Sequence, residues 1–106
     1  MSKFMRIMVF FDLPVKTAEQ RREATRFRNF LLKDGYYMMQ YSVYARVCQG
    51  ADSIETHKAR VRMNLPPHGA VRMLAITERQ YEMIDVLLSP KTVYDEKKYR
   101  DTLTEL

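Results

Sequence analysis

The chain contains little of what several classes of protein require. Its single cysteine, Cys48, cannot form a disulfide within the chain, which favours a reducing, cytoplasmic setting. The longest uninterrupted apolar run covers only residues 7–11, whereas a membrane helix needs roughly 20 apolar residues. Three glycines and four prolines in 106 residues are too few for a disordered or fibrous chain. We therefore expect one compact domain and no membrane partner.

Common catalytic and cofactor motifs are also missing. The sequence has no P-loop and no glycine-rich dinucleotide fingerprint. His57 and His68 are not at metal-ligand spacing, and a lone cysteine cannot complete a zinc site. We expect His57 to be a partly buried packing residue, His68 to belong to a turn, and Cys48 to be a small buried hydrophobic residue. Few groups therefore remain for catalysis.

What the chain has in excess is positive charge. Eighteen Lys and Arg residues against 13 Asp and Glu residues give a formal net charge of +5. A basic balance on a small domain favours a polyanionic partner, with nucleic acid before an anionic membrane surface. Many small proteins are mildly basic for solubility alone, so charge by itself leaves both interpretations open.

Apolar patterning predicts alternating strands and helices. Residues 4–11 are apolar enough for a strand in the middle of a sheet. Thr17 and Gln20 form a capping-box pair that begins a helix, and Gly35 stands where a helix C-terminal cap belongs. Further elements follow from the same patterns: strands over 36–48 with a bend around 40–42, a helix capped by Asp52 and Glu55 and ended by the prolines at 66–69, a strand over 71–76, a helical turn over 77–80 and a strand over 83–88.

This order predicts an α+β fold of the ferredoxin-like βαββαβ type. Its antiparallel sheet carries two helices on one face and has one extra C-terminal strand. Residues 1–90 form the domain, and residues 91–106 form a charged tail for dimer or partner contacts. A chain of this length makes only a modest core, and one sheet face stays open. We therefore expect a homodimer with its sheets packed face to face, and a tail that adds a strand to the partner protomer or another protein.

Asp12 raises the question of why a core strand should end on a carboxylate. The usual answer is a turn or a helix cap, but the cap is already supplied by Thr17, five residues later. A carboxylate at a rigid strand end can instead hold Mg²⁺, with water and phosphate oxygens as the other ligands. One aspartate per chain is little for catalysis, although a two-fold dimer would bring a second copy to the same place. The turn and metal interpretations both stay open.

Basic residues gather on and before the first predicted helix. Arg22, Arg26 and Lys33 fall on one side of it, Arg21 flanks the other side of the apolar face, and Lys16 precedes it. Each of them taken singly fits a solvated helix face equally well. As a group they favour contacts with phosphates rather than with bases, so all five are candidate nucleic-acid-binding residues.

Four tyrosines lie within a short stretch of the predicted strands, at positions 36, 37, 41 and 44. Tyrosine rings can stack on the bases of a nucleic acid. The same residues at strand spacing are typical of a core or an interface, so the sequence does not separate the two roles.

Three separated segments together resemble a known family. They are the strand that ends in Phe11-Asp12 with its basic helix, the segment QYSVYARV at 40–47 after Gly35, and the segment ITERQYEMIDVLL at 76–88. Their order and spacing are similar to those of the CRISPR-associated protein two family, over about residues 5 to 88. Members of that family are small ferredoxin-like homodimers that partner the larger integrase subunit in acquiring new spacers.

The resemblance implies a metal-dependent endonuclease in which Asp12 is the catalytic residue and the ligand of Mg²⁺, or of Mn²⁺ in its place. Phe11 stands where many members carry a tyrosine, and Tyr44 where a phenylalanine is common. Ser42 matches the family's serine, and we expect it to tighten the bend by a backbone hydrogen bond.

Three functions remain open at this point. The first is a nuclease that hydrolyses phosphodiesters of RNA or DNA through paired Asp12 carboxylates. The second is a non-catalytic bridge that holds integrase dimers apart and grips duplex DNA between them. The third is a toxin-like endoribonuclease of the same fold. The scarcity of catalytic groups favours the bridge as the role in the cell.

Overall fold

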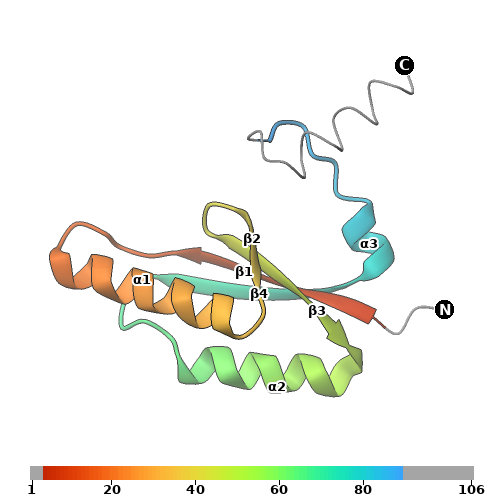
Figure 1. Ribbon diagram of the computed structural model, residues 1–106, viewed down its shortest axis with the longest axis horizontal. Helices are drawn as coiled ribbons and strands as arrows, with labels where there is room; N and C mark the ends of the chain where they lie inside the picture. Colours follow the sequence, from red (N-terminus) through yellow and green to blue (C-terminus); the bar gives the residue numbers. More distant parts are fainter. Residues whose placement is uncertain (1–3, 90–106) are drawn as a thin grey trace.

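The computed structural model describes residues 4–89. In chain order its elements are β1 (Phe4–Asp12), α1 (Ala18–Lys33), β2 (Tyr37–Gln40), β3 (Val43–Gln49), α2 (Gly50–Met63), β4 (Ala70–Thr77) and α3 (Glu78–Glu82). The four strands form one antiparallel sheet in the order β2-β3-β1-β4. Both long helices cover the same face of it (Figure 1). The predicted α+β fold with βαββαβ order is confirmed.

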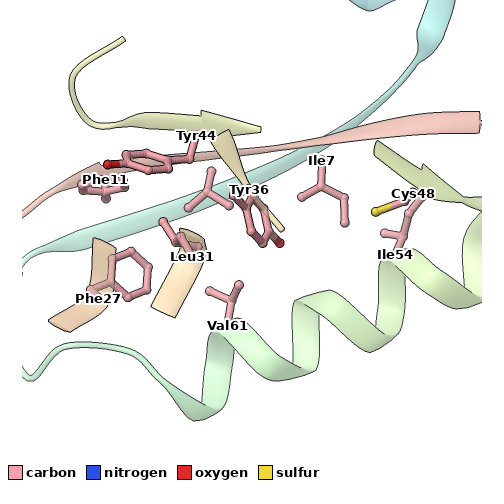
Figure 2. Packing of buried hydrophobic residues seen from close by; sticks show 10 residues of the cluster. Ile7, Phe11, Phe27, Leu31, Tyr36, Tyr44, Cys48, Ile54 and Val61 are labelled. Atoms are coloured by element: carbon pink, nitrogen blue, oxygen red, sulfur yellow. The ribbon is translucent and has the colours of Figure 1, made fainter. Parts of the chain in front are cut away.

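Strand β1 is central because its residues are apolar on both faces. Ile7, Val9 and Phe11 are buried in the cluster between the sheet and the helix layer. The helices contribute Phe27 and Leu31 from α1 and Ile54 and Val61 from α2 to the same cluster (Figure 2). Cys48 and His57 are also buried, as expected for residues that pack in the interior. Burial of these side chains holds the helices against the sheet.

The predicted ends of α1 are confirmed, but the predicted start of the second helix is wrong. The backbone N–H of Gln20 donates to the Thr17 hydroxyl oxygen, and the Gln20 side chain accepts from the Thr17 backbone, as a capping box requires. Helix α2 begins at Gly50, with Gln49 as an N-cap that makes no side-chain capping bond. Because β3 leads directly into α2, Asp52 lies in the first turn of the helix. Its negative charge there interacts favourably with the helix dipole, but its side chain does not cap the helix.

A tight turn joins β2 to β3 at the predicted bend. Gln40 is paired with Val43, so Tyr41 and Ser42 form the turn. Ser42 has a φ of 66°, in the left-handed region that residues other than glycine seldom adopt. The turn rises on the side of the sheet away from α1 and α2 (Figure 1).

Neither α1 nor α2 covers the second face of the sheet, which we call the open face. The short helix α3 reaches it only at one end, where Glu78 and Tyr81 contact Arg6. Side chains alternate along a strand, so Arg6, Met8, Phe10 and Asp12 of β1 point to this side. Its apolar residues, placed by their register with β1, are Met8, Phe10, Val43, Ala45, Val47, Leu74 and Ile76. Leu74 is 50% exposed and Val47 39%. The homodimer predicted through this face stays a prediction.

The extra strand predicted over residues 83–88 is not formed in this chain. Helix α3 ends at Glu82, and the segment after it joins neither edge of the four-stranded sheet. Leu87 and Leu88 are 92% and 94% exposed, because a single extended segment has no ladder partner of its own. The tail at 91–106 lies outside the described residues. Within residues 4–89, no helix combines the length and apolarity that crossing a membrane requires.

Candidate functional site

Asp12 is the last residue of β1, opposite Ala70 of β4, and its side chain is exposed on the open face. The residue before it anchors the strand end from the other side of the sheet. Phe11 is buried and meets Phe27 edge-on at 5.4 Å between ring centroids, and it lies 5.5 Å from Tyr44 (Figure 2). Phe11 and Tyr44 therefore hold the strand end in place without lining the site themselves.

Two backbone contacts at this strand end were not identified from the sequence alone. Gly69 has a φ of 105°, and a Cβ at that position would lie 2.5 Å from the carbonyl oxygen of Asp12. Only glycine lets the loop before β4 come this close. On the other side, the backbone N–H of Phe11 donates to the carbonyl oxygen of Ser42 at 2.9 Å. Ser42 thus does make a backbone hydrogen bond, but it joins the turn to β1 and does not tighten the bend.

Arg72 is a second charged side chain on the open face close to Asp12, and the sequence analysis missed it. It is exposed on β4, opposite Phe10 and two residues from the partner of Asp12. Such diagonal neighbours are about 7–8 Å apart in an antiparallel pair. Alternation along 70–77 would have placed Arg72 on this face once the pairing with β1 was known. A guanidinium beside a carboxylate suits a phosphate held next to a metal ion.

The described part of the chain does not provide a cluster of ligands around Asp12. Within residues 4–89, no three His, Cys, Asp or Glu side chains are close enough to hold an ion together. The Asp12 carboxylate has no hydrogen-bonding or ion-pair partner in that part of the chain. Mg²⁺ is usually held by one or two carboxylates with water and phosphate oxygens.

Four of the five predicted nucleic-acid-binding residues lie in one shallow groove of about 780 Å³ along α1, which we call the basic groove. It is lined by Arg21, Arg22, Arg26 and Lys33, together with Asn29 and with Asn64 from the end of α2. The prediction that Arg21 lies apart from the others is wrong, because its long side chain turns toward the groove. Lys16 is exposed before α1 and is not part of the groove.

The cationic side chains of the basic groove differ in their ion-pair and hydrogen-bonding partners. Arg26 forms an ion pair with Glu23. Arg21 donates to the carbonyl oxygens of Val15 and Lys16 at 3.2 and 3.1 Å. Arg22 and Lys33 have no hydrogen-bonding or ion-pair partner within residues 4–89. Among the described residues, only the charge of Arg26 is therefore offset by an acid, and Arg22 and Lys33 are the two cations whose side chains are not held by another group.

Comparison with known proteins identifies the family. The family model "CRISPR associated protein Cas2" matches residues 5–84, which run from β1 through α3. This chain belongs to the Cas2 family. It is 43% identical over 100 residues to the CRISPR-associated endoribonuclease Cas2 of Campylobacter jejuni, a match that covers 94% of this chain and 69% of that protein. It is 47% identical over 94 residues to the protein of the same name from Acidovorax ebreus, with 89% and 91% covered.

Four other titratable groups of this Cas2-family chain are structural. His57 Nδ1 lies 2.9 Å from Asp34 Oδ2, and Arg60 binds the other oxygen of the same carboxylate at 2.8 Å. His57 is therefore buried and bonded to Asp34. Burial raises the pKa of the Cys48 thiol, which makes it a poor nucleophile. Among the described residues, Asp12 and Arg72 thus remain the groups exposed together on the open face.

Proposed function

We propose that this chain is a metal-dependent endonuclease of a CRISPR system, with RNA as its substrate and Asp12 as its catalytic residue. The observation that carries the proposal is an exposed carboxylate with no partner of its own, fixed at the end of a buried strand. The relatives named above carry the name endoribonuclease, which favours RNA over DNA as the strand that is cut. Cleavage of DNA phosphodiesters by the same groups is the alternative.

The proposed active form is a homodimer that pairs the two open faces. Leu74 and Val47 give this face apolar surface that is exposed to water in the single chain. A two-fold axis brings the same patch of both copies together. Since Asp12 projects from that face at one end of β1, the pairing would bring two carboxylates to one shared cleft. The exposed segment 83–89 and the tail would then add a strand to the other protomer or to the integrase subunit.

In this arrangement the two Asp12 side chains would hold Mg²⁺, or Mn²⁺ in its place. When bound, the ion supplies Lewis acidity to a phosphate oxygen and lowers the pKa of a bound water. Arg72 binds a neighbouring phosphate oxygen and neutralises part of its charge. The scissile phosphodiester bond would then lie between Arg72 and the paired Asp12 carboxylates. Contacts of this kind carry no base preference.

A second function, a bridge in the spacer-acquisition complex, is favoured by the location of the basic groove. The groove lies on the helix layer, whereas Asp12 lies on the open face. Arg22 and Lys33 are therefore placed to hold phosphates that Asp12 of the same chain does not cut. We propose that they grip duplex DNA alongside the integrase subunit, whether or not the nuclease acts in the cell.

The variant Asp12→Asn tests the catalytic proposal. We expect Mg²⁺-dependent cleavage of RNA to be lost, because a neutral amide is a poorer ligand for a hard cation. RNA affinity measured with EDTA should hold or rise, because a negative charge has been removed. Asp52→Asn, the same change on an exposed residue of α2, is the matched control and should cut like wild type.

Sedimentation of the same three proteins checks that they assemble alike. Cleavage by Asp12→Asn at the wild-type rate would contradict the assignment and leave Asp12 as a turn residue. A monomer mass for the wild type at micromolar concentration, in low and moderate salt, would contradict the paired site.

A further inference from the structure

The four tyrosines at positions 36, 37, 41 and 44 differ in their exposure and in their hydrogen-bonding partners. Tyr36 and Tyr44 are buried, at 3% and 4% exposure. The Tyr37 hydroxyl accepts from Arg6 at 2.7 Å and lies beside the hydroxyl of Tyr81. Tyr41 is 90% exposed and has no hydrogen-bonding partner within residues 4–89. Of the four, only Tyr41 has a ring free to meet a ligand.

The β2–β3 turn, which carries Tyr41, adjoins the end of β1 that carries Asp12. The β1–β3 ladder pairs Phe10 with Val43, and the hydrogen bond from Phe11 to Ser42 extends the contact by one residue. Tyr41 precedes Ser42 in the turn and Asp12 follows Phe11 at the end of β1, so the two residues adjoin this hydrogen bond. Figure 1 shows the β2–β3 turn beside the arrowhead of β1 and on the side away from the helices.

The backbone at this turn is held in a conformation that costs energy. Ser42, with its φ of 66°, is the one residue other than glycine with positive φ among residues 4–89. Its carbonyl is thereby turned toward the Phe11 amide, and the fully exposed ring of Tyr41 is carried at the tip. Strained positions of this kind concentrate at binding sites, where the surrounding structure keeps them in place.

We propose that Tyr41 stacks on a base of the RNA next to the phosphodiester held at Asp12, which makes it a substrate-positioning residue for single-stranded RNA. The inference rests on the proposed function at Asp12. Every base has a π-face, so this contact tolerates any sequence. In a duplex the bases already stack on one another, so a strand with accessible bases is favoured. Arg72, on the opposite side of Asp12, would bind the backbone while Tyr41 fixes the base.

The test uses full-length protein in the Asp12→Asn background with EDTA, so that binding is measured without cleavage. The probes are a labelled single-stranded RNA and a set of the same RNA with one abasic position each. Tyr41→Ala should weaken binding of the intact RNA by roughly 5- to 150-fold, which is the range for loss of one base stack. Tyr41→Phe, which keeps the ring, should bind like the parent. Met63→Ala, a truncation of another highly exposed apolar residue, is the control and should also bind normally.

The abasic RNAs decide whether the ring meets a base. We expect one abasic position at which the RNA binds the Asp12→Asn parent as weakly as the intact RNA binds the Tyr41→Ala variant. At that position, Tyr41→Ala should not weaken the binding of the abasic RNA any further. An equal loss for Tyr41→Ala on every RNA, or no loss at all, would overturn the proposal. So would a changed sedimentation mass for Tyr41→Ala, which would show that the ring contacts a second copy. If the abasic position and Tyr41→Ala are coupled in this way, stacking by Tyr41 is supported even if Asp12→Asn still cleaves RNA. The stacking proposal and the catalytic proposal can therefore fail independently.

Discussion

The distribution of free charge in the basic groove makes a quantitative prediction. Arg22 and Lys33 have no partner within residues 4–89, whereas Arg26 is paired with Glu23 and Arg21 is bound to backbone carbonyls. Each phosphate neutralised by a protein cation contributes about −0.9 to the slope of log affinity against log salt for duplex DNA. If Arg22 and Lys33 each meet one phosphate, the double variant to alanine should flatten that slope by up to about 1.8 units.

The assay is duplex binding followed by fluorescence anisotropy at several salt concentrations, with EDTA present. The matched control is Arg62→Ala with Arg79→Ala, which removes the same formal charge from exposed positions outside the groove. Arg26→Ala should flatten the slope less than either free cation does, because its charge is already offset. A control variant that flattens the slope as much as the groove variant would refute a localised phosphate site and leave only a diffuse positive field.

Two further changes test how the site is supported. Gly69→Ala should lower the free energy of unfolding by more than about 1 kcal/mol, because alanine is strained at positive φ and its Cβ would collide with the Asp12 carbonyl. Unfolding in urea measures this change. An unchanged free energy of unfolding would contradict the close approach of Gly69 to Asp12. The hydrogen bond from Arg6 holds the pKa of Glu78 below its usual range, so the stability it contributes is present at neutral pH and lost as pH falls through that lowered pKa. Glu78→Gln should therefore be less stable than wild type at pH 7 and equally stable in strong acid, and a difference independent of pH would exclude the linkage.

The parts of the fold that sequence patterns predicted are those that local chemistry decides. The capping box at Thr17 and the positive φ at Gly35 depend on residues within one helical turn, so they could be recognised directly. The start of α2 could not, because it depends on how β3 runs into Gly50. The apolar segment 83–88 has the composition of a strand, but a strand also needs an edge to pair with, and composition does not supply one.

The candidate site likewise contains one residue that local sequence identified and others that only the fold brings near it. Asp12 was identified from its place after an apolar run, since the strand end and the carboxylate are adjacent in sequence. Arg72 approaches it through the pairing of β1 with β4, and Gly69 and Tyr41 through the loop and the turn that flank the strand end, so their proximity depends on the tertiary fold. A one-residue slip of the pairing between β1 and β4 would turn Arg72 to the other face of the sheet.

The proposed pairing places opposing demands on the open face. Its exposed apolar surface, around Leu74 and Val47, favours burial against a second copy, whereas Asp12 at its end disfavours burial while it is charged. Two such carboxylates in one cleft also repel each other, which weakens the dimer in the absence of a cation. A divalent ion bound between them removes the repulsion, and an ion that binds only the dimer stabilises it by mass action. A single acid per chain can thus serve a metal site if association supplies the second acid and if the cleft stays open enough for water and phosphate to enter.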